Sequence, residues 1–181
     1  MPTPLRVLML EDRQDDAEQI AAALCQAGFL PEWRCVATES DYLAQVSASL
    51  DLLIVSDHLT QFTAVQALRL LQARGLDLPC LVLAETASVE AAVEWMKRGA
   101  ADYLSKDRLM WLGPVVTRVL QEQKRQAEQR RAEAALRASE ERHRSLVESV
   151  HDLLSELDQG GRVLYLSPNH REALGYEPDE L

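Results

Sequence analysis

The sequence predicts an α/β protein built on a doubly wound parallel sheet. Short apolar runs of strand length alternate with segments of helical periodicity, and only short loops join them. Because a helix separates each strand from the next, right-handed crossovers place helices on both faces of the sheet. The 181 residues allow one domain of ordinary size and a smaller segment.

The first strand-and-helix unit lies at the N-terminus. An apolar run predicts a buried strand over residues 5–10, closed by Glu11 and Asp12. A helix is predicted over residues 15–27, with acidic residues in its first turn and Gly28 at its end. The unit then repeats, with strands over residues 33–37, 52–56, 80–84 and 102–104 and helices over residues 39–46, 62–74 and 88–98. This sheet domain is predicted to span residues 1–120.

One long, mostly solvated helix is predicted over residues 121–150, which are rich in Glu, Arg, Gln and Ala and contain no Pro or Gly. Its second half carries a weak heptad seam, and two interpretations stay open: a two-stranded coiled coil that makes a homodimer, or a single amphipathic linker helix. His143 lies in this seam and is predicted to have a packing role. The seam positions are Ala132, Leu136, Ser139, His143, Leu146 and Val150.

Residues 151–181 have the pattern of a different domain. Strands are predicted over residues 153–157 and 162–166 around a Gly-Gly turn, followed by a short helix that opens at residues 167–169. Two strands and a short helix cannot close a core alone. We therefore expect these residues to be an incomplete domain and the chain to be a fragment.

The composition limits the partners and the location. The chain has 29 acidic and 19 basic residues, a net charge of −10, which disfavours binding to nucleic acid or to an anionic membrane surface. The sequence shows neither a signal-peptide pattern nor an apolar run of membrane-spanning length, so a cytoplasmic location is predicted. Cys25, Cys35 and Cys80 lie in apolar stretches and are predicted to be reduced core residues.

Charged residues follow the predicted strands at the sheet edge where such folds bind ligands. Glu11 and Asp12 follow the first strand, Asp57 the third and Lys106 the fifth. Each alone is more often a loop or capping residue, but together they favour a site. Converging carboxylates repel one another unless a cation neutralises them, and oxygen ligands suit Mg²⁺. With a lysine opposite, this is the pattern of an aspartyl-phosphate site in which Asp57 is the nucleophile.

Three segments resemble the strand ends of the response-regulator receiver domain of two-component signalling: residues 5–12 (LRVLMLED), 51–57 (DLLIVSD) and 99–106 (GAADYLSK). The resemblance implies a flavodoxin-like fold with strand order 2-1-3-4-5 and a histidine kinase as phosphoryl donor. It implies these roles: Glu11 and Asp12 as the acidic Mg²⁺-binding pair, the backbone carbonyl of Leu59 as a further metal ligand, Asp57 as phosphoacceptor, Lys106 as its lysine and Tyr103 as aromatic switch residue.

Two places depart from the family pattern. Ala84 stands where receivers carry a Ser or Thr whose hydroxyl moves to the phosphoryl group. Thr86, two residues on, is expected either to replace that hydroxyl or to cap the following helix, and capping is favoured. The loop after Asp57 reads HLTQF and lacks the family's usual Pro and Gly.

The C-terminal part also resembles a known family. Residues 139–150 (SEERHRSLVESV) and 152–181 look like the entry helix and first strands of a PAS sensory domain. In proteins of this organisation the output is commonly a histidine kinase or a diguanylate cyclase. These residues hold no such output, so we expect them not to be an enzyme.

Three functions follow from these observations. The first is a receiver that is phosphorylated on Asp57 and relays the change through the long helix. The second is a pseudo-receiver, an interaction and dimerisation module that does not switch through phosphate, for which Ala84 is the motivating residue. The third, an aspartyl-phosphate phosphatase, needs an Asp-x-Asp pair that the segment DHL at residues 57–59 does not provide.

Overall fold

The computed structural model describes residues 2–86, 88–149 and 155–166. The chain divides into two compact units, Met1–Arg125 and Gln126–Leu181.

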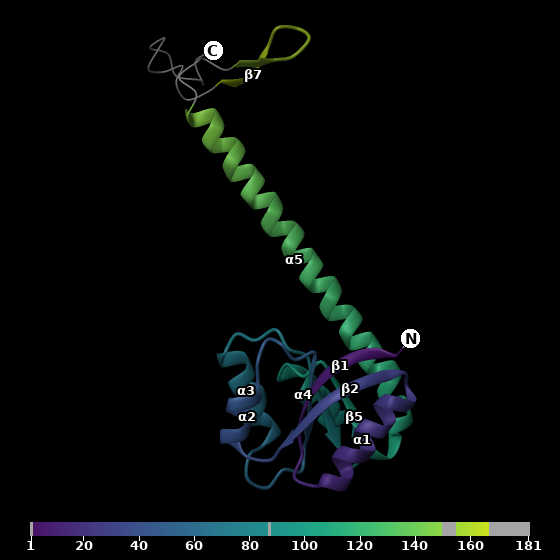
Figure 1. Cartoon of the computed structure of the whole chain (residues 1–181). Helices are drawn as coiled ribbons and strands as arrows, with labels where there is room; N and C mark the ends of the chain where they lie inside the picture. The colour runs from purple at the N-terminus through teal and green to yellow at the C-terminus, as the bar shows by residue number, and fades with distance from the viewer. Residues whose placement is uncertain (1, 87, 150–154, 167–181) are drawn as a thin grey trace. The chain divides into compact units, whose positions relative to one another are not determined.

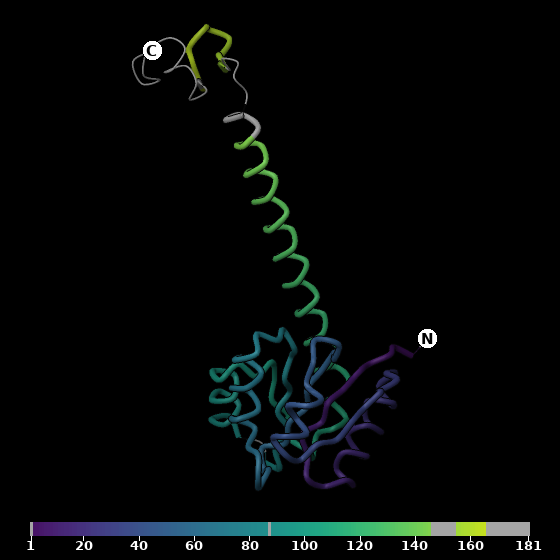
Figure 2. Tube along the Cα trace, turned by 60° about the vertical axis from the view of Figure 1, so that its left-hand side comes forward, coloured from purple at the N-terminus to yellow at the C-terminus, as the bar shows by residue number. Residues whose placement is uncertain are grey.

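The first unit contains a five-stranded parallel sheet with strand order β2-β1-β3-β4-β5. This confirms the predicted flavodoxin-like order. Figures 1 and 2 show helices on both sides of the sheet. The elements are β1 (Thr3–Leu10), α1 (Gln14–Gln26), β2 (Phe29–Val36), α2 (Glu39–Gln45), β3 (Leu52–Ser56), α3 (Ala64–Ala73), β4 (Cys80–Ala84), α4 (Val89–Lys97), β5 (Asp102–Ser105), the 3-10 turn η1 (Lys106–Trp111) and α5 (Leu112–Ser149).

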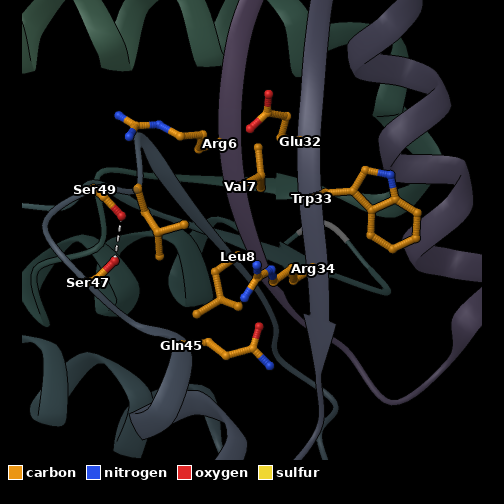
Figure 3. Close-up of a pocket in the computed structure, with 10 residues that line it drawn as sticks. Arg6, Val7, Leu8, Glu32, Trp33, Arg34, Gln45, Ser47 and Ser49 are labelled. Carbon is orange, nitrogen blue, oxygen red and sulfur yellow. Dashed lines mark hydrogen bonds between the residues drawn. The ribbon is translucent and has the colours of Figure 1, made fainter.

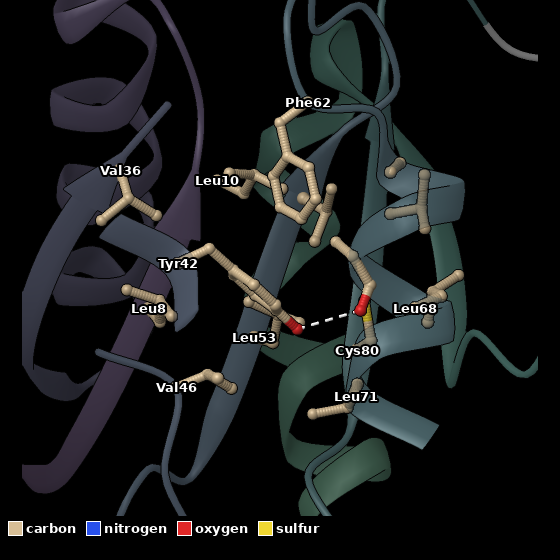
Figure 4. Packing of buried hydrophobic residues seen from close by; sticks show 14 of the residues in the cluster. Leu8, Leu10, Val36, Tyr42, Val46, Leu53, Phe62, Leu68, Leu71 and Cys80 are labelled. Carbon is tan, nitrogen blue, oxygen red and sulfur yellow. Dashed lines mark hydrogen bonds between the residues drawn. The ribbon is translucent and has the colours of Figure 1, made fainter. Parts of the chain in front are cut away.

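Each face of the sheet has its own hydrophobic core, because side chains alternate along a strand. On one face, Leu8, Leu53 and Val82 pack with residues of α2 and α3 (Figure 4). The hydroxyl of Tyr42 on α2 donates to the carbonyl of Ala67 on α3 at 3.0 Å, so this buried polar group has a partner. On the other face, strand residues including Ile54 pack with α1 and with the beginning of α5. The central strands are buried on both faces, which explains their continuous apolar sequences.

The second strand begins four residues earlier than predicted. It spans Phe29–Val36 and pairs with the whole of β1, from Thr3 opposite Phe29 to Leu10 opposite Val36. The strand contains Pro31, which has no backbone N–H and disfavours a strand inside a sheet. Because β2 is an edge strand, this missing donor is tolerated.

Two helix boundaries depend on capping residues. Helix α3 begins at Ala64, after Thr63, whose side chain forms a capping box with Gln66. Helix α4 is capped by Ser88, whose hydroxyl accepts from the Ala91 amide at 3.2 Å. The favoured role of Thr86 as this cap was therefore wrong, because Ser88 is closer to the first turn.

Helix α5 begins at Leu112, earlier than the predicted linker. Within the first unit, Leu112, Val116 and Val119 are buried, so this part of the helix belongs to the domain core. In the second unit the helix is exposed over residues 128–145, and Leu136 of the heptad seam is 60% exposed. Val150 of the seam lies outside the described residues.

The second unit also contains an antiparallel strand pair, β6 (Ser155–Leu157) and β7 (Val163–Leu166). The turn between them has Gly161 at φ +83° and Asp158 accepting from the Gly160 amide at 2.8 Å. This agrees with the predicted pair around a Gly-Gly turn. The short helix expected from residue 167 lies outside the described residues.

The cysteines differ from the prediction at one position. Cys80 is buried and Cys35 is partly buried, but Cys25 is exposed and is not a core residue. It is not one of the buried positions of α1, which are Ala17, Ile20, Ala21 and Leu24. Within the described residues, no helix has the length and apolar character needed to cross a membrane.

The beginning of α5 approaches the end of α1 at Gly113. A Cβ atom at Gly113 would lie 2.3 Å from the Ala27 Cβ. We expect Gly113→Ala to lower the free energy of unfolding by about 1–3 kcal/mol, because overpacking outweighs the gain in helix propensity. Urea unfolding followed by circular dichroism measures this loss.

The double variant Gly113→Ala with Ala27→Gly removes the overlap and serves as the control. It should recover part of the lost stability. An unchanged urea midpoint for Gly113→Ala alone would contradict the close contact.

Candidate functional site

The charged residues predicted from the sequence lie at the carboxyl edge of the sheet. Glu11 follows β1, Asp57 follows β3 and Lys106 follows β5, and a further carboxylate, Glu85, follows β4. In an open parallel sheet this edge is where ligands bind. The strand order β2-β1-β3-β4-β5 brings the four loops together there.

The ammonium group of Lys106 is bound by three carboxylates. Its Nζ lies 2.6 Å from Asp16 Oδ2, 2.9 Å from Glu11 Oε2 and 3.1 Å from Glu85 Oε1. The Lys106 side chain is only 12% exposed. Burial lowers the pKa of Lys106, but the hydrogen bonds to Asp16, Glu11 and Glu85 outweigh it and raise the pKa above its usual value. Lys106 is therefore firmly charged.

Glu11 has a second structural role in the loop after β1. Its Oε1 accepts from the backbone amides of Asp12 at 3.1 Å and Arg13 at 3.2 Å, and its side chain is 2% exposed. These bonds fix the chain where it enters α1. Asp12 itself is exposed. Both carboxylate oxygens of Glu11 thus have partners, whereas Asp12 faces solvent.

Asp57 carries a carboxylate oxygen without a partner. Its Oδ1 is buried and, among the described residues, accepts no hydrogen bond. The nearest opposite charge is His58, whose Nε2 lies 3.9 Å away and is charged only when protonated. Burial raises the pKa of Asp57, against smaller lowering effects from His58, the Glu85 backbone and Lys106. The backbone holds Asp57 in place, because its amide donates to the Leu83 carbonyl at 2.9 Å.

The three switch positions are brought to neighbouring places. Ala84 ends β4, is 1% exposed and pairs with Ser105 of β5. Thr86 is exposed, and its backbone carbonyl accepts from the Tyr103 hydroxyl at 2.8 Å. Tyr103 is thereby connected to the loop that follows β4, although Ala84 supplies no hydroxyl there.

Sequence reasoning gave no site role to three residues that the structure places there. Asp16 was explained as an acidic residue of a helix first turn, but its carboxylate binds Lys106. Glu85 directly follows β4 at the ligand edge, which was the available signal for its contact with Lys106. His58 follows Asp57 in the sequence, and no metal-ligand spacing pointed to it.

One oxygen atom at this edge is suited to binding a hard cation. Asp57 Oδ1 is a buried carboxylate oxygen with an unfilled coordination capacity, and oxygen atoms are the ligands that Mg²⁺ prefers. No group of three or more His, Cys, Asp and Glu side chains in the described parts of the chain is arranged to hold a metal ion. The assignment of Glu11, Asp12, Asp57 and the Leu59 carbonyl as Mg²⁺ ligands stays a prediction.

A separate cavity of about 310 Å³ lies beside β1 and β2, near the beginning of β3 (Figure 3). Arg6 in its wall pairs with Asp51 at 2.9 Å, and Glu32 lies on the same strand as Arg34. The positive charges of Arg6 and Arg34 in the wall are thus offset by the negative charges of Asp51 and Glu32. The cavity is lined by Arg6, Val7, Leu8, Glu32, Trp33, Arg34, Gln45, Ser47, Ser49 and Leu50.

The Asp57 carboxylate, whose buried Oδ1 accepts no hydrogen bond from the described residues, should cost stability when it is charged. We expect Asp57→Asn to raise the free energy of unfolding at pH 7 by about 1 kcal/mol, because it removes a buried charge. Since the folded-state pKa of Asp57 is raised, the cost appears as pH rises through that pKa and is absent below the ordinary Asp value.

Urea unfolding of both proteins at pH 7 and near pH 4 measures this dependence. The stability gained through Asp57→Asn should be smaller near pH 4 than at pH 7. An equal gain at both pH values would contradict the link to the charge of Asp57.

Curated response regulators are similar to the chain in sequence. The probable transcriptional regulatory protein SilR of Salmonella typhimurium is 28% identical over 102 residues, which cover 56% of this chain and 44% of SilR. The response regulator RppA of Synechocystis sp. is 29% identical over 107 residues, which cover 59% of this chain and 46% of RppA. The chain thus spans less than half the length of these relatives. No protein-family model matches it.

Solved receiver structures share the fold. The signal receiver domain of a LuxO repressor protein from Vibrio parahaemolyticus has a TM-score of 0.58 and 21% identity, covering 68% of this chain and 95% of that one. A response-regulator receiver protein from Pseudoalteromonas atlantica has a TM-score of 0.55 and 21% identity, covering 65% and 98%. The sheet domain therefore has the fold of response-regulator receiver domains, and sequence similarity to response regulators supports the same assignment.

Proposed function

We propose that the sheet domain is a two-component receiver that accepts a phosphoryl group on Asp57 from a histidine kinase. The observation that carries this proposal is the buried, unpartnered Oδ1 of Asp57 at the ligand edge of the sheet. Because this oxygen accepts no hydrogen bond from the described residues, no such bond has to break before it attacks phosphorus. The similarity to curated response regulators supports the same function.

The chemistry is a phosphoryl transfer. A carboxylate oxygen of Asp57 forms a bond to phosphorus as the bond between phosphorus and the donor's leaving group breaks, and the leaving group departs with the electron pair. The product is an aspartyl phosphate. Lys106 is the nearby cation in the described site and provides positive charge for the oxygens of the transferred group.

A bound Mg²⁺ supplies charge neutralisation for the phosphoryl oxygens. We propose that the carboxylates of Asp57 and Asp12 and the Leu59 carbonyl hold it, with Glu11 as the second member of the acidic pair. The Leu59 side chain is 7% exposed and belongs to the hydrophobic core, so it anchors the loop that carries this carbonyl.

The change at Asp57 would then be relayed to the long helix. Phosphorylation adds negative charge beside the loop that follows β4, and Tyr103 is bonded to that loop through Thr86. The beginning of α5 packs on the sheet through Leu112 and Val116. We propose that α5 carries the change toward a PAS domain whose start is residues 151–181.

We propose a regulatory rather than an enzymatic role for these residues, with output from elsewhere in the full protein and with a cytoplasmic location. The net charge of −10 supports protein partners over nucleic acid or an anionic membrane.

A pseudo-receiver is the second candidate. Ala84 is 1% exposed, and it stands at the position where the resemblance to receivers implies a hydroxyl that binds the phosphoryl group, so the domain would lack this part of the usual switch. In this alternative the fold serves as a phosphorylation-independent dimerisation and interaction module.

Phosphorylation is tested by incubating the full chain with acetyl phosphate and Mg²⁺ and measuring its intact mass. We expect one labile phosphoryl adduct, because Asp57 has a free oxygen. Asp57→Asn should show no adduct, and omission of Mg²⁺ should greatly reduce it.

Asp51→Asn is the control for an aspartate outside the site, because Asp51 lies at the other end of β3, where it is bound by Arg6. It should keep the adduct. Folded wild-type protein that forms no adduct, also when histidine kinases are offered, would favour the pseudo-receiver.

Dimerisation through the long helix is tested by sedimentation velocity. We propose that the seam of residues 132–150 joins two chains, because Leu136 is an exposed large apolar side chain within a mostly polar stretch of the helix. Leu136→Glu should shift the dimer toward monomer by about tenfold or more in dissociation constant.

Ala134→Glu is the matched control, since it adds the same charge outside the seam. It should leave the dimer intact. A monomeric wild-type chain would contradict the coiled-coil interpretation and leave the single linker helix.

A further inference from the structure

Lys106 uses its whole hydrogen-bonding capacity on carboxylates. A lysine ammonium group has three N–H donors. In the described part of the chain its acceptors are Glu11, Asp16 and Glu85, all within 3.1 Å, and Asp57 is not among them. A phosphoryl oxygen on Asp57 can bind Lys106 only if one of these carboxylates gives up its place.

Two of the three carboxylates lie outside the predicted phosphorylation machinery. Asp16 belongs to the first turn of α1 and Glu85 to the loop after β4. Asp16 makes the shortest of the three contacts, at 2.6 Å, and its side chain is 12% exposed. Glu85 is 39% exposed, so water screens its contact more strongly.

Arg13 supports the same arrangement from the solvent side. Its Nη1 lies 3.7 Å from Asp16 Oδ2 and 4.0 Å from Glu85 Oε1. Arg13 is 64% exposed, so these contacts are weak, but they place a second cation between the two carboxylates. Asp16, Glu85 and Lys106 also line one cavity of about 340 Å³.

We propose that Asp16 and Glu85 are positioning residues that hold Lys106 away from Asp57 and thereby slow phosphoryl transfer to Asp57. They compete with the incoming phosphoryl group for the same ammonium donors. This inference rests on the proposed receiver function and adds an inhibitory effect of Asp16 and Glu85 to it, which is called the brake from here on.

If this brake exists, phosphoryl transfer to Asp57 should become faster when the side chain of Asp16 or Glu85 loses its charge. Asparagine and glutamine keep the shape and an acceptor oxygen, but they bind an ammonium group less strongly than a carboxylate does. We expect the rate constant for adduct formation to rise about tenfold in Asp16→Asn and about threefold in Glu85→Gln, following their burial.

The experiment measures this rate constant in the full chain with acetyl phosphate and Mg²⁺ by intact mass. Asp15→Asn is the matched control, because it removes the same charge from the same helix turn on an exposed residue. It should keep the wild-type rate. Asp16→Glu restores the charge and should return the rate toward wild type, which a purely structural role of Asp16 does not predict.

The outcomes separate this inference from the proposed function. If wild type forms the adduct and Asp16→Asn and Glu85→Gln form it no faster, the brake is overturned while the receiver function stands. A rise in Asp15→Asn equal to that in Asp16→Asn also overturns it, since general repulsion of the anionic donor then explains the rate. If neither folded wild type nor any variant forms an adduct, also when histidine kinases are offered, both the receiver function and the brake are overturned.

Discussion

The ammonium group of Lys106 is the interaction on which the ligand edge of the sheet depends. Glu11, Asp16 and Glu85 come from three separate segments, and their carboxylates meet within hydrogen-bonding distance of one Nζ atom. Three negative charges so close together repel one another strongly unless a cation lies between them. Lys106 therefore fixes the loop after β1, the first turn of α1 and the loop after β4 at once.

The fold brings this lysine to its position through ordinary packing. Strand β5 pairs with β4 from Asp102 opposite Leu81 to Ser105 opposite Ala84, and Lys106 follows immediately. The buried hydroxyl of Ser105 donates to Asp107, which holds the turn after the lysine. The same geometry leaves Asp57 without the lysine contact. The site thus combines a lysine whose ammonium donors are all bound with an Asp57 carboxylate whose Oδ1 accepts no hydrogen bond from the described residues, and the proposed function and its brake both follow from this difference.

The sequence was sufficient for the features that depend on pattern. The strands Leu52–Ser56 and Cys80–Ala84 have the predicted bounds, because buried strands of a parallel sheet are continuous apolar runs. Placement of Asp57 and Lys106 at one edge followed from the strand order. The choice of partners for Lys106 depends on side-chain geometry across segments up to 95 residues apart, which no local pattern contains. The early start of β2 likewise needed the knowledge that Pro31 lies on an edge strand.

The most direct test of this account is a double-mutant cycle on stability with Lys106→Met and Asp16→Asn, measured by urea unfolding at pH 7. Removing the ammonium group leaves the three carboxylates without their counter-charge. We therefore expect Lys106→Met to lower the free energy of unfolding by about 2 kcal/mol or more. In the Asp16→Asn background the loss should be smaller by about 1 kcal/mol. Additive effects, or a Lys106→Met variant as stable as wild type, would contradict the central place of this ammonium group.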